Sequence, residues 1–392
     1  SAMASVVVDP YLLSLIFATT ILGVIIGVLP GLGATTGAAL LLPFTLTMDP
    51  VHAIAVLATI YVSATFAGSI TAILINTPGT SAAAATTFDG YPLAQKGEAG
   101  RALGIAVISS TVGGIFSVII LCFAAPLLAR VAYEFRSPEY FALTVFGLSM
   151  LASISAGGAV KNLIGGIFGV WLSTIGAERV TGIERFMFGN YELYEGLHFV
   201  PIFIGLFAIS ELLVQSKTVN KIINTVTMKA VKLPTIEDYK KIWKTILRSC
   251  GIGTFIGVLP AEGATVASMI GYSEARRWSK NKKEFGKGAI EGIAGAEAAN
   301  NAATGGAMVP TMVLGIPGSG TTAIILVGLM VHGLRPGVYL FTEQVEKVYQ
   351  IFGSMFVANV MFVSLVRDSK TASEVELGSG KYVEVPASET IL

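Results

Sequence analysis

The stretch GVLPGLGAT, residues 27–35, decides the fold because it interrupts an apolar helix and because the chain repeats it. GVLPAEGAT at residues 257–265 matches it, with each identical position 230 residues later. A second motif follows each copy, NTPGT at 76–80 and GIPGS at 315–319, and the two prolines lie 239 residues apart. Glycine and proline break helices, and at membrane depth such breaks are tolerated only where protein or a water-lined cavity satisfies the freed backbone groups. Paired breaks in two halves are typical of the binding site of a secondary transporter.

The composition indicates a membrane protein. Of the 392 residues, 53% are hydrophobic and only 13% are charged, and the mean hydropathy is +0.72; a soluble domain carries about 25% charged residues. Several apolar stretches approach the roughly 20 residues that a helix needs to cross a bilayer. They are 11–29, 51–75, 104–129, 139–156, 162–176 and 199–214. We predict an all-α polytopic membrane protein with about 9–11 membrane segments and no β-barrel pattern.

The distribution of charge predicts the topology. Of the 26 Lys and Arg residues, 14 fall in two clusters, at 217–248 and 276–287. The positive-inside rule places both clusters in cytoplasmic loops, and we favour this interpretation over a nucleic-acid or anionic-lipid patch. The acidic segment 177–198 suits the opposite face. No nucleic-acid partner is therefore predicted.

The stretch between the two basic clusters predicts a re-entrant hairpin. Its apolar arms, 246–259 and 264–272, are each too short to span the membrane, yet both ends face the same side by charge. A hairpin with its tip at Leu259–Gly263 satisfies both conditions if neighbouring helices shield the tip. The first copy, 11–46, either forms the same hairpin or crosses the membrane fully with its 19-residue first arm.

These patterns divide the chain into two expected structural repeats, related by inversion, around scaffold helices. The N-terminus lacks the basic start and cleavage site of a signal peptide, so 11–29 is interpreted as a retained first helix. The expected segments are 1–10, an N-terminal leader; 11–101, the first repeat; 102–214, scaffold helices; 215–245, a basic cytoplasmic linker; 246–338, the second repeat; 339–366, a last helical segment; and 367–392, a polar tail.

A broken helix offers two kinds of binding group. Its unpaired N–H groups attract carboxylates, and its unpaired C=O groups coordinate a cation such as sodium. Hydroxyl and amide side chains concentrate at all four breaks, although a single Ser or Thr equally often caps local backbone. The predicted substrate and ion site comprises Gly31, Gly33, Thr35, Asn76, Thr77, Pro78, Gly79, Thr80, Glu262, Gly263, Thr265, Glu297, Asn300, Asn301, Pro317, Gly318 and Ser319. Sodium is the expected coupling cation, and no other cofactor is expected.

Charged residues at membrane depth are sparse, and burying them is costly enough to indicate function. Glu297 precedes Asn300 and Asn301 by three and four residues, so one helix face can present the carboxylate with either amide. We expect a substrate or coupling role for this group. Glu291 and Asp89 are further candidates, whereas Lys161 and Glu211 can extend toward the membrane surface.

The sequence gives no support for an enzyme. It contains neither a Gly-x-x-x-x-Gly-Lys-Ser/Thr phosphate loop nor a His-Glu-x-x-His zinc motif. Its three histidines are scattered, and Cys122 and Cys250 lie far apart in apolar surroundings, which is typical of packing residues.

Three segments together resemble the large membrane subunit of tripartite tricarboxylate transporters, the TctA type. They are GVLPGLGA at 27–34, NTPGT at 76–80, and EAANNA at 297–302 followed by GIPGS at 315–319. The resemblance covers roughly residues 11–360. It implies a cation-coupled importer of carboxylates in the bacterial inner membrane. It also implies two protein partners, a small four-helix membrane subunit and a periplasmic substrate-binding protein.

The chain departs from the family pattern in two places. Ala261-Glu262 replaces the glycine-rich pair usual after the second Leu-Pro, which puts a carboxylate at the hairpin tip. Family members also continue with further helices beyond the position of Phe362, where this chain becomes polar. The alternative function is a passive channel or a non-transporting assembly subunit, and a membrane enzyme ranks third.

Overall fold

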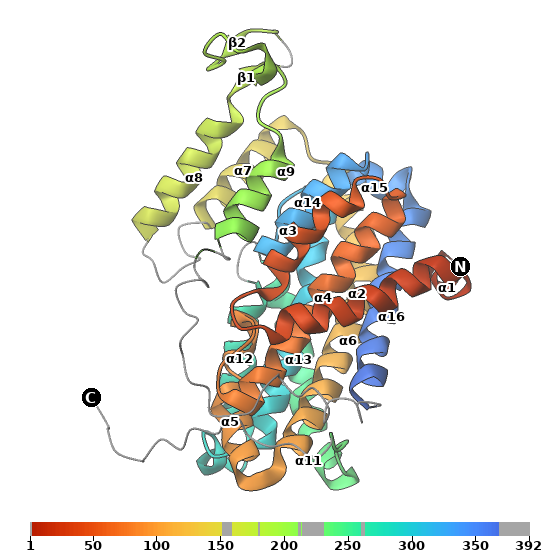
Figure 1. Cartoon of the computed structure of the whole chain (residues 1–392), viewed down its shortest axis with the longest axis vertical. Helices are drawn as coiled ribbons and strands as arrows, with labels where there is room; N and C mark the ends of the chain where they lie inside the picture. The colour runs from red at the N-terminus through yellow and green to blue at the C-terminus, as the bar shows by residue number, and fades with distance from the viewer. Residues whose placement is uncertain are drawn as a thin grey trace, which may run out of the picture.

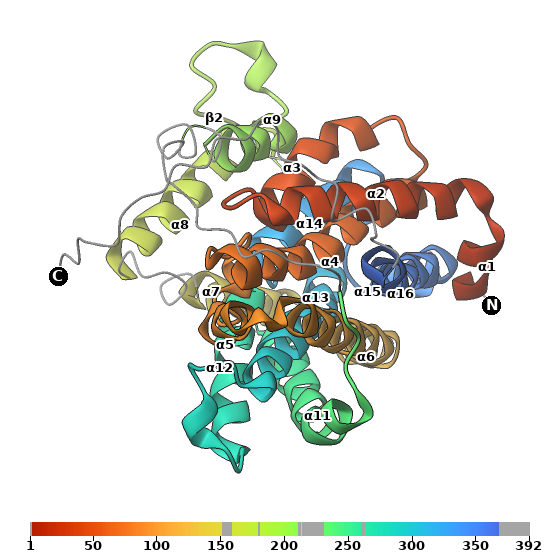
Figure 2. The ribbon, with the colours of Figure 1, turned by 60° about the horizontal axis from the view of Figure 1, so that its bottom comes forward.

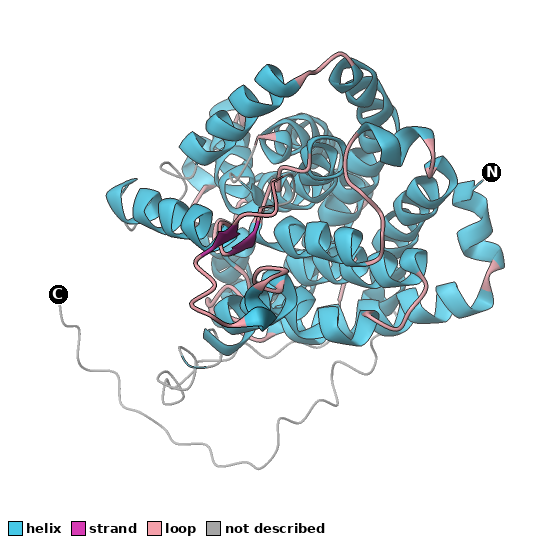
Figure 3. Cartoon of the chain, turned by 90° about the horizontal axis from the view of Figure 1, so that it is seen from above, coloured by secondary structure: helices cyan, strands magenta, loops and turns pink. Residues whose placement is uncertain are grey.

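A computed structural model of the chain describes residues 2–150, 159–178, 181–210, 213, 231–259 and 263–367. The described part is almost entirely helical, and Figure 3 shows the single small pair of strands. The all-α prediction is therefore confirmed. Glu211, Glu262 and residues 368–392 of the predicted tail lie outside the described residues.

The elements run in chain order through two halves and the segment between them. The first half contains α1 (Ala2–Val8), α2 (Pro10–Val28), α3 (Gly33–Thr45), α4 (Pro50–Ile75), η1 (Ser81–Ala83), α5 (Thr87–Leu93), η2 (Ala94–Glu98) and α6 (Ala99–Tyr133). Then come α7 (Ser137–Met150), α8 (Ala159–Ser173), β1 (Gly176–Ala177), β2 (Glu184–Arg185), η4 (Tyr191–Leu193), α9 (Phe199–Phe203) and η5 (Ile204–Ile209). The second half contains α11 (Ile236–Val258), α12 (Gly263–Trp278), η6 (Lys282–Glu284), α13 (Ile290–Leu314), α14 (Gly320–Val331), α15 (Val338–Thr342) and α16 (Val345–Arg367).

Helices α4 and α13 form the centre of the molecule. Nearly every residue of both is buried. Helix α4 packs against α2, α3 and α16, and α13 packs against α6, α11 and α12 (Figure 2). Both helices are rich in Ala, and α13 also in Gly, so their neighbours approach closely, as is usual for helices that pack within membranes.

Four helical stretches in the described residues are long and apolar enough to cross a membrane. They are Pro10–Val28, Pro50–Ile75, Thr87–Tyr133 and Val345–Leu365. Val160–Ser173 and Gly320–Val331 are shorter apolar helices. The chain is thus a membrane protein, while the larger number of membrane segments and the re-entrant hairpins remain predictions.

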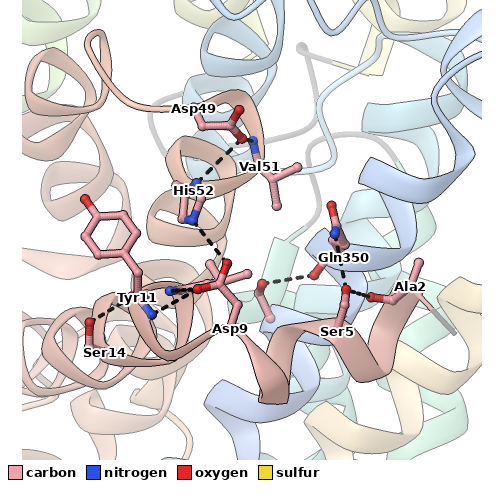
Figure 4. A network of polar contacts seen from close by, with 11 residues as sticks. Ala2, Ser5, Asp9, Tyr11, Ser14, Asp49, Val51, His52 and Gln350 are labelled. Carbon is pink, nitrogen blue, oxygen red and sulfur yellow. Dashed lines mark hydrogen bonds and ion pairs between the residues drawn. The ribbon is translucent and has the colours of Figure 1, made fainter.

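The residues predicted as an N-terminal leader pack against the rest of the described structure. Helix α1 packs on α16, and Ser5 Oγ accepts a hydrogen bond from Gln350 Nε2 at 3.2 Å (Figure 4). The Asp9 carboxylate then caps α2 by accepting the Tyr11 and Leu12 N–H groups. It also lies 3.7 Å from Nε2 of His52, which is in the first turn of α4. His52 Nδ1 lies 3.6 Å from Asp49, the residue that caps α4. These contacts fix where α2 and α4 begin.

The helix boundaries differ from two predicted segment boundaries. Helix α6 starts at Ala99, so it runs across the boundary predicted between 101 and 102, and it packs on α13. Helix α11 begins at Ile236, inside the predicted linker 215–245, because Thr235 and Asp238 form a reciprocal capping box. The lysines of 240–244 therefore lie on a helix.

Arg101 ties the start of α6 to the start of α11. Its guanidinium lies 2.5 Å from the Asp238 carboxylate, which is only 2% exposed, and 2.6 Å from Glu98. The Lys232 N–H also donates to the Gly100 carbonyl at 2.9 Å. These contacts hold the two halves together where α6 and α11 begin.

Arg101→Gln is expected to weaken the fold only above acidic pH. The hydrogen bond from Arg101 lowers the pKa of Asp238 from 3.8 to about 2. A lowered carboxyl pKa stabilises the folded state above the unfolded pKa, and this contribution disappears as the pH falls from about 4 to about 2. The loss at neutral pH should be about 1.5 kcal/mol, after allowance for the partial exposure of Arg101. The measurement is the thermal unfolding midpoint as a function of pH. Arg277→Gln, which removes an exposed ion pair, is the control and should change the midpoint little. A lower midpoint for Arg101→Gln that persists at pH 2 would contradict the prediction.

Helices α7, α8 and α9 and the β1–β2 hairpin lie to one side of the main body (Figure 1). Many of their apolar side chains are exposed, including Phe141, Ile164 and Phe168. Apolar side chains gathered in this way are typical of a surface that contacts lipid or another protein.

Candidate functional site

Both central helices end in the same backbone conformation at the predicted breaks. Asn76 ends α4 with φ 53°, and Gly315 ends α13 with φ 69°, both in the left-handed region. The Thr77 N–H then bonds to the Thr71 carbonyl at 3.4 Å, and the Ile316 N–H bonds to the Pro310 carbonyl at 3.3 Å. Gly is the usual residue for this turn and Asn the next best, which is why NTPGT and GIPGS stop these helices.

Each break lies against the helix that ends at the Gly-Val-Leu-Pro motif of its own half. A Cβ atom added to Gly79 would lie 2.0 Å from the Gly27 carbonyl oxygen, and one added to Gly318 would lie 2.9 Å from that of Gly257. The Gly31 N–H also donates to the Gly79 carbonyl at 3.2 Å. The duplicated glycines are thus needed for close backbone contact.

Hydroxyl groups join each half to the other. Thr35 on α3 forms a 2.9 Å hydrogen bond with Thr321 on α14. Thr265 on α12 donates a 2.9 Å hydrogen bond to Ser81 on η1. The first turn of each helix after a Gly-Val-Leu-Pro motif therefore contacts the segment after the break of the opposite half.

A cavity of about 800 Å³ lies where these segments meet. Its wall is Gly31, Leu32, Gly33, Ala34, Thr35, Thr36, Tyr61, Thr65, Pro78, Gly79, Thr80, Ser81, Ala82, Leu206, Ser210, Gly263, Ala264, Thr265, Val266, Ser319, Gly320 and Thr321. None of these described wall residues is charged. Helices α3, α12 and α14 all begin at this wall, so their unpaired N–H groups and positive dipole ends lie at the cavity.

The cavity brings together nine of the predicted site residues. They are Gly31, Gly33, Thr35, Pro78, Gly79, Thr80, Gly263, Thr265 and Ser319. Asn76, Thr77, Pro317 and Gly318 shape the two breaks but are not among the wall residues. Glu262 lies outside the described residues.

Sequence reasoning missed Tyr61 and Thr65 as wall residues. They stand four residues apart on α4, hence on one face, and the Tyr61 hydroxyl accepts a 3.2 Å hydrogen bond from Ser319. The sequence did not mark them out, because α4 carries four further hydroxyl residues, Thr59, Ser63, Ser69 and Thr71. Ser210, assigned to the scaffold, also reaches the wall.

Glu297, Asn300 and Asn301 form a separate buried cluster rather than part of the cavity wall, unlike the single site that we predicted. All three side chains are 0% exposed. Glu297 accepts hydrogen bonds from the Thr86 hydroxyl, from Ser110 Oγ at 2.8 Å and from Asn300 Nδ2 at 3.2 Å. Asn301 Nδ2 donates to Asn300 Oδ1 at 2.7 Å, while Asn301 Oδ1 has no partner among the described residues.

The cluster and the cavity share one segment of chain. Ala82 lines the cavity, and its carbonyl oxygen accepts a 3.2 Å hydrogen bond from Asn300 Nδ2. Thr86, four residues further on, donates to Glu297. A change at the cavity wall can therefore reach the buried carboxyl through residues 80–87.

Comparison with known proteins places the chain in a family. It is 40% identical over 356 residues to the uncharacterized 52.8 kDa protein in the TAR-I ttuC' 3' region of Agrobacterium vitis, an alignment that covers 89% of this chain and 70% of the relative. It is 42% identical over 113 residues to an uncharacterized protein in the TAR-II ttuC' 3' region of the same organism, covering 29% of this chain and 47% of that relative. No solved structure matches the chain. The model of the tripartite tricarboxylate transporter TctA family matches residues 13–367, so the chain belongs to that family.

Proposed function

We propose that this chain is the large membrane subunit of a secondary transporter that imports carboxylates with a cation gradient. The observation that carries the proposal is a cavity whose described wall residues are uncharged and at which three helices begin. Backbone N–H groups and hydroxyls there can bind carboxylates without an arginine, as at other helix N-termini. Family membership makes a tricarboxylate-like substrate the natural candidate.

We also propose that the two halves are inverted structural repeats. Support comes from matched contacts at the repeated positions. A Cβ atom on Gly27 or on Gly257 would lie 2.4 Å from a carbonyl oxygen of the central helix of the same half, Ala64 or Ala303. The hydroxyl pairs Thr35–Thr321 and Thr265–Ser81 also match. In each pair, the threonine in the first turn after one Gly-Val-Leu-Pro motif bonds to a hydroxyl after the break of the other half.

Sodium is the coupling cation that we propose. The ends of α4 and α13 leave carbonyl groups unpaired, and hydroxyl oxygens stand nearby, which are the hard oxygen ligands that sodium accepts at broken helices. Binding of the cation beside an anionic substrate would offset the substrate's charge, and none of the wall residues that the structure describes carries a charge that could do so.

The proposed partners are a small four-helix membrane subunit and a periplasmic binding protein that delivers the substrate, in the bacterial inner membrane. The exposed apolar faces of α7 and α8 are suited to lipid or to the membrane subunit. Uptake of labelled citrate into proteoliposomes, with both partners supplied, tests the whole proposal. Uptake should follow an inward sodium gradient, and flux that is indifferent to every cation gradient would favour a passive channel.

Thr35→Val and Thr265→Val are each expected to raise the KM for citrate uptake roughly 10-fold or more, because a hydrogen bond to a charged group contributes about 1.5–3 kcal/mol. Valine keeps the shape of threonine and removes the hydroxyl. The matched control is Thr45→Val on the same helix as Thr35, because the Thr45 hydroxyl bonds only to the Leu42 carbonyl within α3. Unchanged KM values in both cavity variants would argue against substrate binding at this wall.

A further inference from the structure

The Glu297 carboxyl lies in an environment that does not suit a negative charge. It is 0% exposed, and its hydrogen-bond partners, Thr86, Ser110 and Asn300, are all neutral. No described cation forms an ion pair with it. A buried carboxylate without a compensating charge is costly, so the group has to be neutralised.

The titratable groups on the helices around α13 are held elsewhere. Asp89 on α5 accepts the N–H groups of residues 286–289, Arg101 on α6 pairs with Asp238 and Glu98, and Glu291 on α13 accepts from Ser279. The remaining titratable residues on packed elements that are at least partly buried are His52 and Tyr61 on α4, Tyr91 on α5, Cys122 on α6, Arg248 and Cys250 on α11, and Tyr272 and Glu274 on α12. Among the described residues, none of these groups forms a hydrogen bond or ion pair with Glu297.

A proton suits this site better than a metal ion. Both carboxyl oxygens already have partners, and α6 lies so close to α13 that a Cβ on Gly113 would stand 2.3 Å from the Ala298 carbonyl oxygen. The described residues contain no group of three or more acidic, His or Cys side chains that could hold a metal. A proton needs no such space.

The hydrogen bonds also indicate which oxygen would carry the proton. Asn300 Nδ2 donates to Oε1, and its orientation is set because it also donates to the Ala82 carbonyl while Asn300 Oδ1 accepts from Asn301. Oε1 also receives the Thr86 hydroxyl. The hydrogen-bond partner of Oε2 among the described residues is Ser110 Oγ, a hydroxyl that can accept as well as donate.

We propose that Glu297 binds a proton at Oε2, taken up from the aqueous phase, and that residues 80–87 couple this proton to carboxylate binding in the cavity. The inference rests on the proposed function, and this proton is additional to the sodium ion proposed at the helix ends. The coupling segment is a run of short turns, with backbone bonds from Ala83 to Thr80, Ala84 to Ser81 and Thr86 to Ala83. Its first residues line the cavity, and its last ones contact the Asn300–Glu297 pair.

The sign of the coupling follows from charge. Loss of the proton puts a negative charge behind the wall that contacts an anionic substrate, which weakens substrate binding. Linkage is reciprocal, so bound substrate should favour the proton by the same factor. Couplings of this kind are commonly about 5- to 150-fold in affinity.

The test uses purified full-length protein and citrate as the probe. In wild type, citrate affinity should fall about 10-fold or more from about pH 6 to about pH 9. In Glu297→Gln, a neutral mimic of the protonated acid, it should stay high. Glu291→Gln makes the same change six residues earlier on α13 and should retain the wild-type pH dependence. Comparison of variants at one pH removes the effect of citrate's own titration.

Infrared spectroscopy checks the proton directly and needs no transport. The carbonyl band of a protonated carboxylic acid should be present in wild type and Glu291→Gln and absent in Glu297→Gln. A band unaffected by Glu297→Gln would overturn the proposal, as would equal pH dependence of citrate binding in wild type and Glu297→Gln. The infrared result does not depend on the proposed transport function. Failure of the proton proposal can therefore be distinguished from failure of the proposed function.

Thr86→Val supplies a second variant that keeps the carboxyl. The Thr86 hydroxyl donates to Oε1 and so stabilises the ionised form more than the acid. Its loss should move the midpoint of the pH dependence upward by about one pH unit. A midpoint that stays in place or moves downward would contradict the assignment of Glu297 as the titrating group.

Discussion

Gly253→Ala and Gly257→Ala are each expected to destabilise the protein by about 3 kcal/mol and to abolish citrate uptake. An added Cβ would lie 2.2 Å from the Ala299 carbonyl oxygen at Gly253, and 2.4 Å from that of Ala303 at Gly257. The contacted atoms belong to the backbone of α13, which cannot rotate away as a side chain would. The new methyl group therefore has to push α11 away from α13.

Gly251→Ala is the matched control, since it lies on the same helix and nothing stands within 4 Å of an added Cβ. Alanine favours a helix over glycine by up to about 1 kcal/mol, so this variant should be unchanged or slightly more stable. Thermal unfolding midpoints of the three variants in detergent make the comparison. Equal midpoints would mean that close contact between α11 and α13 does not support the fold.

The prediction extends to the first half. A Cβ on Gly23 would lie 1.9 Å from Ser63 Oγ, and one on Gly27 would lie 2.4 Å from the Ala64 carbonyl oxygen. Gly23→Ala should be milder than Gly27→Ala, because a side-chain hydroxyl can rotate and a backbone carbonyl cannot. If the two halves are structural repeats, Gly27→Ala and Gly257→Ala should both lower the stability of the protein.

The helix breaks could be predicted from sequence because they depend on local backbone chemistry. Asn76 and Gly315 are the residue types that end helices in the left-handed conformation, and the prolines that follow prevent continuation. Thr35 and Thr265 were likewise found because they occupy equal positions in two matching motifs. Most of the cavity wall follows from these local signals.

The separation of Glu297 from the cavity could not be predicted in the same way. Periodicity shows that Glu297, Asn300 and Asn301 share part of a helix surface, but not which neighbour covers it. The covering residues, Thr86 and Ser110, come from segments about 200 residues away in the chain. Their hydroxyls had no sequence pattern that linked them to a carboxylate.

The early start of α11 was missed for a different reason. Residues 236–245 are rich in lysine, which favoured a linker over a helix. The capping box of Thr235 and Asp238 was present in the sequence as Thr-x-x-Asp, a recognised start signal, and could have corrected the boundary. Tyr61 offered no comparable signal, because an aromatic residue in an apolar helix usually packs in the core.

Asp89→Ala is expected to destabilise the protein by about 4 kcal/mol and to loosen the contact between the two halves. Asp89 Oδ1 accepts four backbone N–H groups, from Gly286, Lys287, Gly288 and Ala289, at 2.8–3.1 Å. The carboxylate is 0% exposed and lies at the start of α13, where a negative charge is favoured. Alanine would leave these donors without their acceptor.

The consequence reaches beyond local stability because Asp89 is in the first half and its partners are in the second. Lys96 Nζ reinforces the same contact by donating to the Lys287 carbonyl at 2.6 Å, and a Cβ on Gly288 would lie 3.2 Å from Leu93. Hydrogen exchange at residues 286–289 should therefore rise in Asp89→Ala, together with the drop in unfolding midpoint. Asp89→Asn keeps one acceptor oxygen and should lose about half as much stability.

Asp49→Ala provides the control, since Asp49 also accepts a backbone N–H, from Val51, but is exposed at the start of α4. Loss of such a helix cap costs about 1 kcal/mol and should leave exchange at 286–289 unchanged. A similar cost for Asp89→Ala and Asp49→Ala would show that Asp89 is an ordinary cap. A larger loss of stability for Asp89→Ala, with faster hydrogen exchange confined to 286–289, would show that one buried carboxylate holds α5 to the start of α13. That carboxylate then joins the half that carries Thr86 to the half that carries Glu297.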